Sequence, residues 1–163
     1  MRFSILSLIA LLTLSGCAEK GAFDLFKMDD AHERSVEQLR TGGIVLSLET
    51  KALISALYLN PVYPETYHEG ESFIAAIYFE NDNRSVKKRD FADIGYSLTL
   101  NGAQPVEIEE LKENDLRRNL IPVRNNWNRY YLVRYKTFSE GNLALRLENN
   151  QTGKVVLNYQ KGK

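Results

Sequence analysis

The chain has 163 residues, and its 21 basic and 21 acidic side chains leave a formal net charge of zero at pH 7. A neutral chain lacks the bulk positive field that favours nucleic-acid binding, so we expect no nucleic-acid partner. The single cysteine, Cys17, excludes an intramolecular disulfide, and the stability of the fold therefore has to come from packing.

Residues 1–16 have the order of parts found in a secretory signal. A basic Met-Arg start precedes an apolar run over residues 3–14, and small residues follow that run. A helix over the run would be about 18 Å long, whereas the hydrocarbon core of a bilayer is about 30 Å thick. The run is therefore too short to remain in the membrane as a span.

The motif Leu14-Ser15-Gly16-Cys17 resembles the lipobox of bacterial lipoproteins. The resemblance implies that residues 1–16 are removed as a lipoprotein signal peptide, that Cys17 is the lipidation site, and that residues 17–24 are a lipidated tether. Two or three acyl chains hold a protein stably, whereas one chain binds only marginally. Ala18, rather than Asp, follows the cysteine, which resembles the pattern of lipoproteins sent to the outer membrane. The alternatives are an ordinary signal peptide with a chance Gly-Cys and a free buried thiol.

We predict one N-terminal helix over residues 25–41. Asp30 and Glu33 have the spacing of a capping box, and Thr41-Gly42-Gly43 marks the end of the helix. The apolar stripe that we expect to pack on the domain consists of Leu25, Met28, His32, Val36 and Leu39. A helix lying on the membrane is the alternative, and acidic side chains along the same segment disfavour it.

From residue 44 to residue 160 the hydrophobic period is two. Seven or eight short strands separated by turns predict a mainly β domain, namely an antiparallel β-sandwich of immunoglobulin-like type with one helix in front. Residues 44–59 form either two strands or one long bent strand. The run Phe73–Phe79 is apolar at every position, which predicts a strand covered on both faces.

Two hairpins are predicted further along the chain. Asn101-Gly102 is a strong turn signal, and it predicts pairing of the strand at 96–100 with the strand at 106–108. Leucines at every second position of 143–147 are followed by a polar turn and a similar alternation at 155–159, which predicts the closing hairpin.

The groups needed for catalysis or metal binding do not gather in the sequence. Only His32 and His68 could serve as imidazole bases, and no Gly-x-Ser-x-Gly elbow is present. The single Glu-x-x-His spacing, from Glu65 to His68, is interpreted as a solvated turn. Carboxylates within residues 107–110 leave an enzyme as a third possibility. We predict no catalytic residue, no metal and no cofactor.

The candidate binding segment is Trp127, Asn128, Arg129 and Tyr130. Its tryptophan is the only one in the chain, and tryptophan with arginine is typical of binding hot spots. The tendency of tryptophan to bury favours a different interpretation, in which Trp127 plugs one end of the sandwich and Tyr130 or Tyr131 lies in the core. A basic loop is a further candidate, interpreted as a solvated surface, and contains Arg84, Lys87, Lys88 and Arg89.

These observations predict a membrane-anchored lipoprotein of the bacterial cell envelope, held by lipid on Cys17, with the outer membrane favoured over the inner. We expect a non-enzymatic protein-interaction or assembly module that docks on another envelope protein or complex, through the loops at 60–70 and 125–129 or through an open sheet edge. The alternative is a carbohydrate- or peptide-binding lipoprotein that uses Trp127 and the neighbouring tyrosines.

Overall fold

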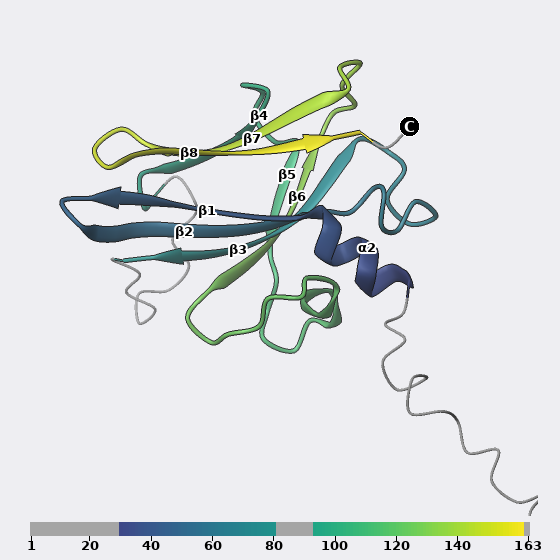
Figure 1. Ribbon diagram of the computed structural model, residues 1–163, viewed down its shortest axis with the longest axis horizontal. Helices are drawn as coiled ribbons and strands as arrows, with labels where there is room; N and C mark the ends of the chain where they lie inside the picture. The colour runs from purple at the N-terminus through teal and green to yellow at the C-terminus, as the bar shows by residue number, and fades with distance from the viewer. Residues whose placement is uncertain (1–29, 81–92, 162–163) are drawn as a thin grey trace, which may run out of the picture.

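The computed structural model describes residues 30–80 and 93–161, which form two antiparallel β-sheets and one N-terminal α-helix, α2 (Asp30–Gln38) (Figure 1). The predicted β-sandwich with one helix in front is confirmed. The predicted signal peptide, Cys17, the predicted tether and the predicted basic loop at 84–89 lie outside the described residues. No helix in the described part of the chain is both long enough and apolar enough to cross a membrane.

The larger sheet has five strands in the order β1-β2-β3-β6-β5, and the smaller has three in the order β4-β7-β8. In the larger sheet the strands are β1 (Leu39–Leu46), β2 (Glu49–Tyr58), β3 (Glu71–Phe79), β6 (Arg129–Tyr135) and β5 (Glu107–Glu110). In the smaller sheet they are β4 (Tyr96–Leu100), β7 (Asn142–Asn149) and β8 (Gly153–Gln160).

The strand order can be compared with that of the immunoglobulin sandwich. When β1 is set aside, the orders β2-β3-β6-β5 and β8-β7-β4 correspond to the A-B-E-D and G-F-C sheets of a constant-type domain. Strand β1 extends the first sheet beyond β2 and also contacts β8, so that the edges of the two sheets meet there (Figure 1). We therefore continue to interpret this strand order as immunoglobulin-like.

The space between the sheets is filled by alternate side chains from both, here called the inter-sheet core. Phe73 of β3 lies near its centre, with its ring centroid 4.9 Å from that of Tyr58 and 5.2 Å from that of Tyr159. The predicted closing hairpin is confirmed, because Leu145 of β7 pairs with Leu157 of β8 and both are buried in this core. Aromatic rings in offset and edge-to-face contact stabilise such a core beyond their buried area.

Strand β3 is buried on both faces, as its uninterrupted apolar run predicts. Its second face, away from the small sheet, carries a separate hydrophobic group that we call the outer cluster. Two loops, at 59–70 and 111–128, cover this face and contribute side chains to the group. The members of the outer cluster are Leu57, Leu59, Val62, Tyr67, Ile74, Ala76, Leu111, Ile121, Tyr130 and Leu132.

The predicted extent of the helix, to residue 41, is wrong. Helix α2 ends at Gln38, and Leu39 already belongs to β1. Gly42 lies inside this strand because β8 passes very close to it: a Cβ atom there would lie 2.5 Å from Cγ2 of Val155. Gly42 therefore serves the contact between two strands, and the glycine pair does not stop a helix.

Of the predicted apolar stripe, Leu39 packs against the outer cluster, but it belongs to β1, and the part of the stripe that lies on the described helix is wrong. Ser35 is the buried residue of α2, and its hydroxyl donates to the carbonyl of Ala31 at 2.7 Å. Val36 is 50% exposed and His32 is exposed. The helix therefore rests on the domain through a small polar side chain, a contact that hydrophobic spacing does not reveal.

The predicted pairing of β4 with β5 is wrong as well, although the turn exists. Asn101 and Gly102 have φ values of 48° and 82°, and Leu100 and Ala103 exchange two backbone hydrogen bonds across them. The pairing does not continue beyond Leu100 and Ala103. Instead, the side-chain oxygen of Asn101 accepts a hydrogen bond from the amide of Ala144 in β7 at 2.8 Å. Strand β4 therefore stays with β7, and the chain crosses to the other sheet before β5 begins.

Residues 39–58 form two strands rather than one bent strand, and they meet in a two-residue turn at Ser47 and Leu48. Both turn residues have positive φ, 53° and 67°, as a type I′ hairpin requires. Leu48 is 99% exposed at the tip, at the opposite end of β1 from α2 (Figure 1). This turn is unusual because glycine or asparagine normally occupies such positions.

Candidate functional site

The structure divides the predicted binding segment between the surface and the interior. Trp127 is 63% exposed, so the interpretation that it plugs the sandwich is wrong. Tyr130 and Tyr131 are both buried, the first in the outer cluster and the second in the inter-sheet core. Asn128 is 7% exposed, and Arg129 is half-buried.

The loop before β6 presents Trp127 outward because its base is fastened to the sheet. The hydroxyl of Tyr130 donates to the carbonyl of Val123 at 3.0 Å and accepts from the amide of Asn125 at 3.1 Å. The side-chain oxygen of Asn125 in turn accepts from the amide of Asn128 at 2.8 Å. With these groups satisfied within the loop, Trp127 is the side chain left at the turn facing solvent.

An open groove of about 1440 Å³ lies beside this tryptophan, and we call it the Trp127 groove. It is bounded by the end of β5, by the loop at 112–119 and by the loop at 124–130. Four carboxylates and four cations line it, so the lining as a whole carries no net charge. The carboxylates are Glu109, Glu110, Glu113 and Asp115, and the cations are Lys112, Arg118, Arg124 and Arg129. Five asparagines complete the polar lining, namely Asn114, Asn119, Asn125, Asn126 and Asn128.

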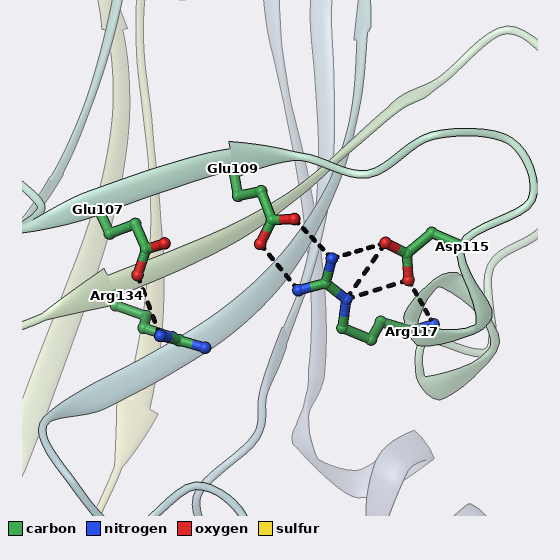
Figure 2. Close-up of polar contacts among 5 residues, drawn as sticks. All are labelled: Glu107, Glu109, Asp115, Arg117 and Arg134. Atoms are coloured by element: carbon green, nitrogen blue, oxygen red, sulfur yellow. Dashed lines mark hydrogen bonds and ion pairs between the residues drawn. The ribbon is translucent and has the colours of Figure 1, made fainter.

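One wall of the groove is held from behind by Arg117 (Figure 2). Its guanidinium donates to both carboxylate oxygens of Glu109 in β5, at 2.8 and 2.6 Å, and also to Asp115, at 2.6 Å for the shortest contact. Asp115 caps the short 3₁₀ helix η2 (Leu116–Leu120) by accepting from the amide of Arg117 at 2.9 Å. The arginine thus joins the edge strand to the loop that forms the wall.

These contacts keep the acidic groups charged at neutral pH. Hydrogen bonds from Arg117 lower the pKa of Asp115 to about 2 and also lower the pKa of Glu109. The same two carboxylates raise the pKa of Arg117. Beside them, Glu107 pairs with Arg134 at 3.0 Å across the β5–β6 ladder (Figure 2). A general acid needs a raised pKa, so these carboxylates have the character of structural ion pairs.

The floor of the groove combines an aromatic ring with an unsatisfied amide. The guanidinium carbon of Arg118 lies 4.1 Å from the centroid of the Tyr130 ring, in a cation–π contact. Arg129 lies 3.6 Å from Glu110. The Oδ1 atom of Asn128 is buried and has no hydrogen-bond partner among the described residues. Buried polar atoms are nearly always paired, so this oxygen is an exception among the described residues.

The loop at 60–70 lies on the same face of the large sheet but adds no chemical site. Tyr67 anchors it in the outer cluster, and burial raises the pKa of its hydroxyl. Glu65 and His68 are exposed, so their spacing belongs to a surface turn. Within residues 30–80 and 93–161, no group of three or more metal-ligating side chains comes together.

A buried charged group that we did not predict lies at the start of β3. Glu71 is fully buried, and it accepts from the hydroxyl of Tyr58 at 2.5 Å and from the ammonium of Lys161 at 2.6 Å. Burial and the bond to Glu71 raise the pKa of Tyr58. The only sequence signal was a glutamate opening an otherwise apolar strand. Neither pair faces the Trp127 groove, and we interpret them as structural.

Comparisons with known proteins leave the chain without a family assignment. No protein-family model, no curated protein and no solved structure matches it. The groove around Trp127 therefore has to be interpreted from its own residues.

Proposed function

We propose that this chain is a lipid-anchored protein of a bacterial envelope whose β-sandwich acts as a non-enzymatic interaction module, with the Trp127 groove as its contact surface. The observation that carries the proposal is the 63% exposure of Trp127 beside an open groove. A large ring left in solvent next to a concave surface is typical of a binding hot spot.

The rigidity of the groove supports the same proposal. Tyr130 fastens the loop that carries Trp127, and Arg117 fastens the opposite wall to β5. Because both walls are held by hydrogen bonds within the chain, a partner would lose little free energy in ordering them. Preorganised walls of this kind favour recognition.

The anchor rests on the lipobox resemblance of Leu14-Ser15-Gly16-Cys17. Labelling of cells with radioactive palmitate tests it directly, and we expect label on the wild-type chain. Cys17→Ser should remove both the label and the association with the membrane fraction. A wild-type chain that takes up no label, or a Cys17→Ser chain that stays membrane-bound, contradicts the anchor.

The first candidate partner is another envelope protein or complex, because the tether confines the module to the membrane surface and raises its effective concentration there. A photoreactive amino acid at exposed Leu116, on the groove, should capture a defined partner in intact cells. Capture should be lost in Trp127→Ala. The matched control places the same group at Leu48, on the β1–β2 hairpin at the far edge of the large sheet. Equal capture from both positions, or capture that survives Trp127→Ala, contradicts the proposal.

The second candidate is a carbohydrate or peptide ligand. The specific observation that favours it is the polar lining of the groove, with five asparagines around a single exposed indole. Binding sites for small molecules and for carbohydrate or peptide chains use a few polar groups in fixed positions and one or two aromatic surfaces.

A further inference from the structure

The charge of the Trp127 groove restricts the class of molecule that it can hold. Its four carboxylates are matched by four cations in the lining, and groups of both signs are already engaged, since Arg117 holds Glu109 and Asp115 and two of the lining cations have contacts of their own. Arg118 lies over Tyr130 and Arg129 lies beside Glu110. An anionic ligand would meet as much repulsion as attraction, and so would a cationic one. The groove therefore favours a ligand without net charge.

Of the two candidate partners, the small apolar area of the groove favours a carbohydrate over a protein. Of the large hydrophobic side chains exposed on the described residues, those that line the groove are Ile108, Leu116 and Trp127. The centre of a protein interface is apolar and loses its water, whereas this lining is mostly amide and charged groups. A ligand rich in hydroxyl groups matches such a lining better.

The side chains present are those that recognise sugar rings. One face of a sugar ring is a row of C–H groups that packs on an indole, and its hydroxyls both donate and accept hydrogen bonds. Asparagine amides also donate and accept, as hydroxyls require.

The size and shape of the groove suit a chain rather than a single ring. Its volume of about 1440 Å³ exceeds the range of about 300–1,000 Å³ that is usual for small-molecule pockets, and it is open to solvent. We infer that the Trp127 groove binds an uncharged oligosaccharide segment, with one sugar ring packed on Trp127 and its neighbours bonded to the asparagines. This inference rests on the proposed function of the groove as a binding surface.

The test uses the full lipidated chain in a detergent without a sugar headgroup, because a glycosidic detergent would compete for the site. The probes are cellotetraose, maltotetraose and chitotetraose, with tetragalacturonate as the anionic control. Calorimetry measures affinity, and the emission of Trp127, the only tryptophan in the chain, reports contact. We expect at least one neutral tetrasaccharide to bind with a Kd of about 1 mM or tighter and to shift the emission.

Three variants decide whether the contact is the one inferred. Trp127→Ala should weaken binding at least about tenfold, and Trp127→Phe should retain part of the affinity because a ring remains. Leu48→Ala removes an even more exposed hydrophobic side chain elsewhere and should change nothing. Binding that survives Trp127→Ala, or tighter binding of tetragalacturonate, overturns the inference.

Failure of the inference can be separated from failure of the proposed function. If no neutral tetrasaccharide binds but photo-crosslinking from Leu116 still depends on Trp127, the groove is a binding surface for another class of partner, and the glycan inference is overturned alone. If neither sugar binding nor crosslinking depends on Trp127, both proposals are overturned.

Discussion

Arg117 binds the carboxylate of Glu109 through two parallel hydrogen bonds, from Nη1 at 2.8 Å and from Nη2 at 2.6 Å (Figure 2). The same guanidinium also holds Asp115, so one side chain joins an edge strand to the 3₁₀ turn beyond it. Lysine could not replace this contact, because an ammonium group cannot form the planar fork. The wall of the Trp127 groove therefore depends on the shape of one arginine as well as on its charge.

The first prediction concerns acid. The pKa of Asp115 in the folded chain, about 2, lies below its usual value of 3.8. A lowered pKa stabilises the loop fully above about pH 4, and this stabilisation is lost as the pH falls toward 2. The protection of the amides of residues 112–120, which compares their exchange rate with the intrinsic rate at the same pH, should therefore fall over that window in the wild type. In Arg117→Met this protection should already be low at neutral pH, and an identical pH profile of protection in both chains would contradict the assignment.

The second prediction compares the contributions of Trp127 and Tyr130 to the free energy of unfolding. Trp127→Ala should change the free energy of unfolding by less than about 0.5 kcal/mol, because the ring is mostly exposed. Tyr130→Phe should cost about 1 kcal/mol, because the amide of Asn125 and the carbonyl of Val123 both lose the hydroxyl. Urea unfolding measures both. Acrylamide should quench the emission of Trp127 efficiently in the folded chain, whereas poor quenching would place the ring in the interior.

The third prediction uses two adjacent glycines as a matched pair. A Cβ atom at Gly42 would lie 2.5 Å from Val155 and 3.1 Å from Leu157, so Gly42→Ala should destabilise by about 1–2 kcal/mol. A Cβ atom at Gly43 would meet nothing closer than 3.5 Å, so Gly43→Ala should be neutral or slightly stabilising. Thermal unfolding of the two variants provides the comparison. Equal effects would mean that β8 does not pack tightly on β1.

The fourth prediction concerns the buried carboxylate of Glu71. Lys161→Met should destabilise by about 3 kcal/mol, because it leaves a fully buried charge without its counter-ion. Glu71→Gln should cost less, about 1–2 kcal/mol, because the amide can still accept from the hydroxyl of Tyr58. The double variant should be less destabilised than the sum of the two single variants. Additive effects in urea unfolding would show that the two side chains do not interact.

The fifth prediction concerns the turn at Ser47 and Leu48. Left-handed backbone costs ordinary residues about 1 kcal/mol or more each, and the chain uses Asn-Gly at its other turn of this kind. Replacing Ser47-Leu48 with Asn-Gly should therefore raise the free energy of unfolding by about 1–2 kcal/mol. The matched control, Gly102→Ala in the second turn, should lower it, because that glycine has a φ of 82°. A loss of stability in the Asn-Gly variant would contradict the assigned turn geometry.

Alternation of apolar residues was sufficient to predict the strands whose neighbours are close in sequence. The pairing of Leu145 with Leu157 followed from period two on both sides of one polar turn, and the double burial of β3 followed from its unbroken apolar run. The strand order of the two sheets and the path from β4 to β5 involve contacts far apart in the chain. The dipeptide Asn101-Gly102 specified the turn but not the strand that pairs with β4. The side chain of Asn101 accepts a hydrogen bond from β7, which is the strand that β4 pairs with.

The candidate site shows a similar limit. Its residues could be singled out as candidates, because a lone tryptophan beside an arginine is typical of binding hot spots. The exposure of Trp127 could not, because burial depends on Tyr130 occupying the space beneath the loop and turning the indole outward. The role of Arg117 was also missed, since nothing local marks it as the residue that meets both Glu109 and Asp115.

The outer cluster also bears on how such a protein can evolve. Leu111, Ile121 and Tyr130 fasten the groove loops to the outside of the large sheet, away from the packing between the sheets. Residues between these three anchors can be exchanged, lengthened or randomised while the sandwich beneath keeps its shape. The loops are in this respect comparable to the variable loops of a scaffold, which change independently of its frame.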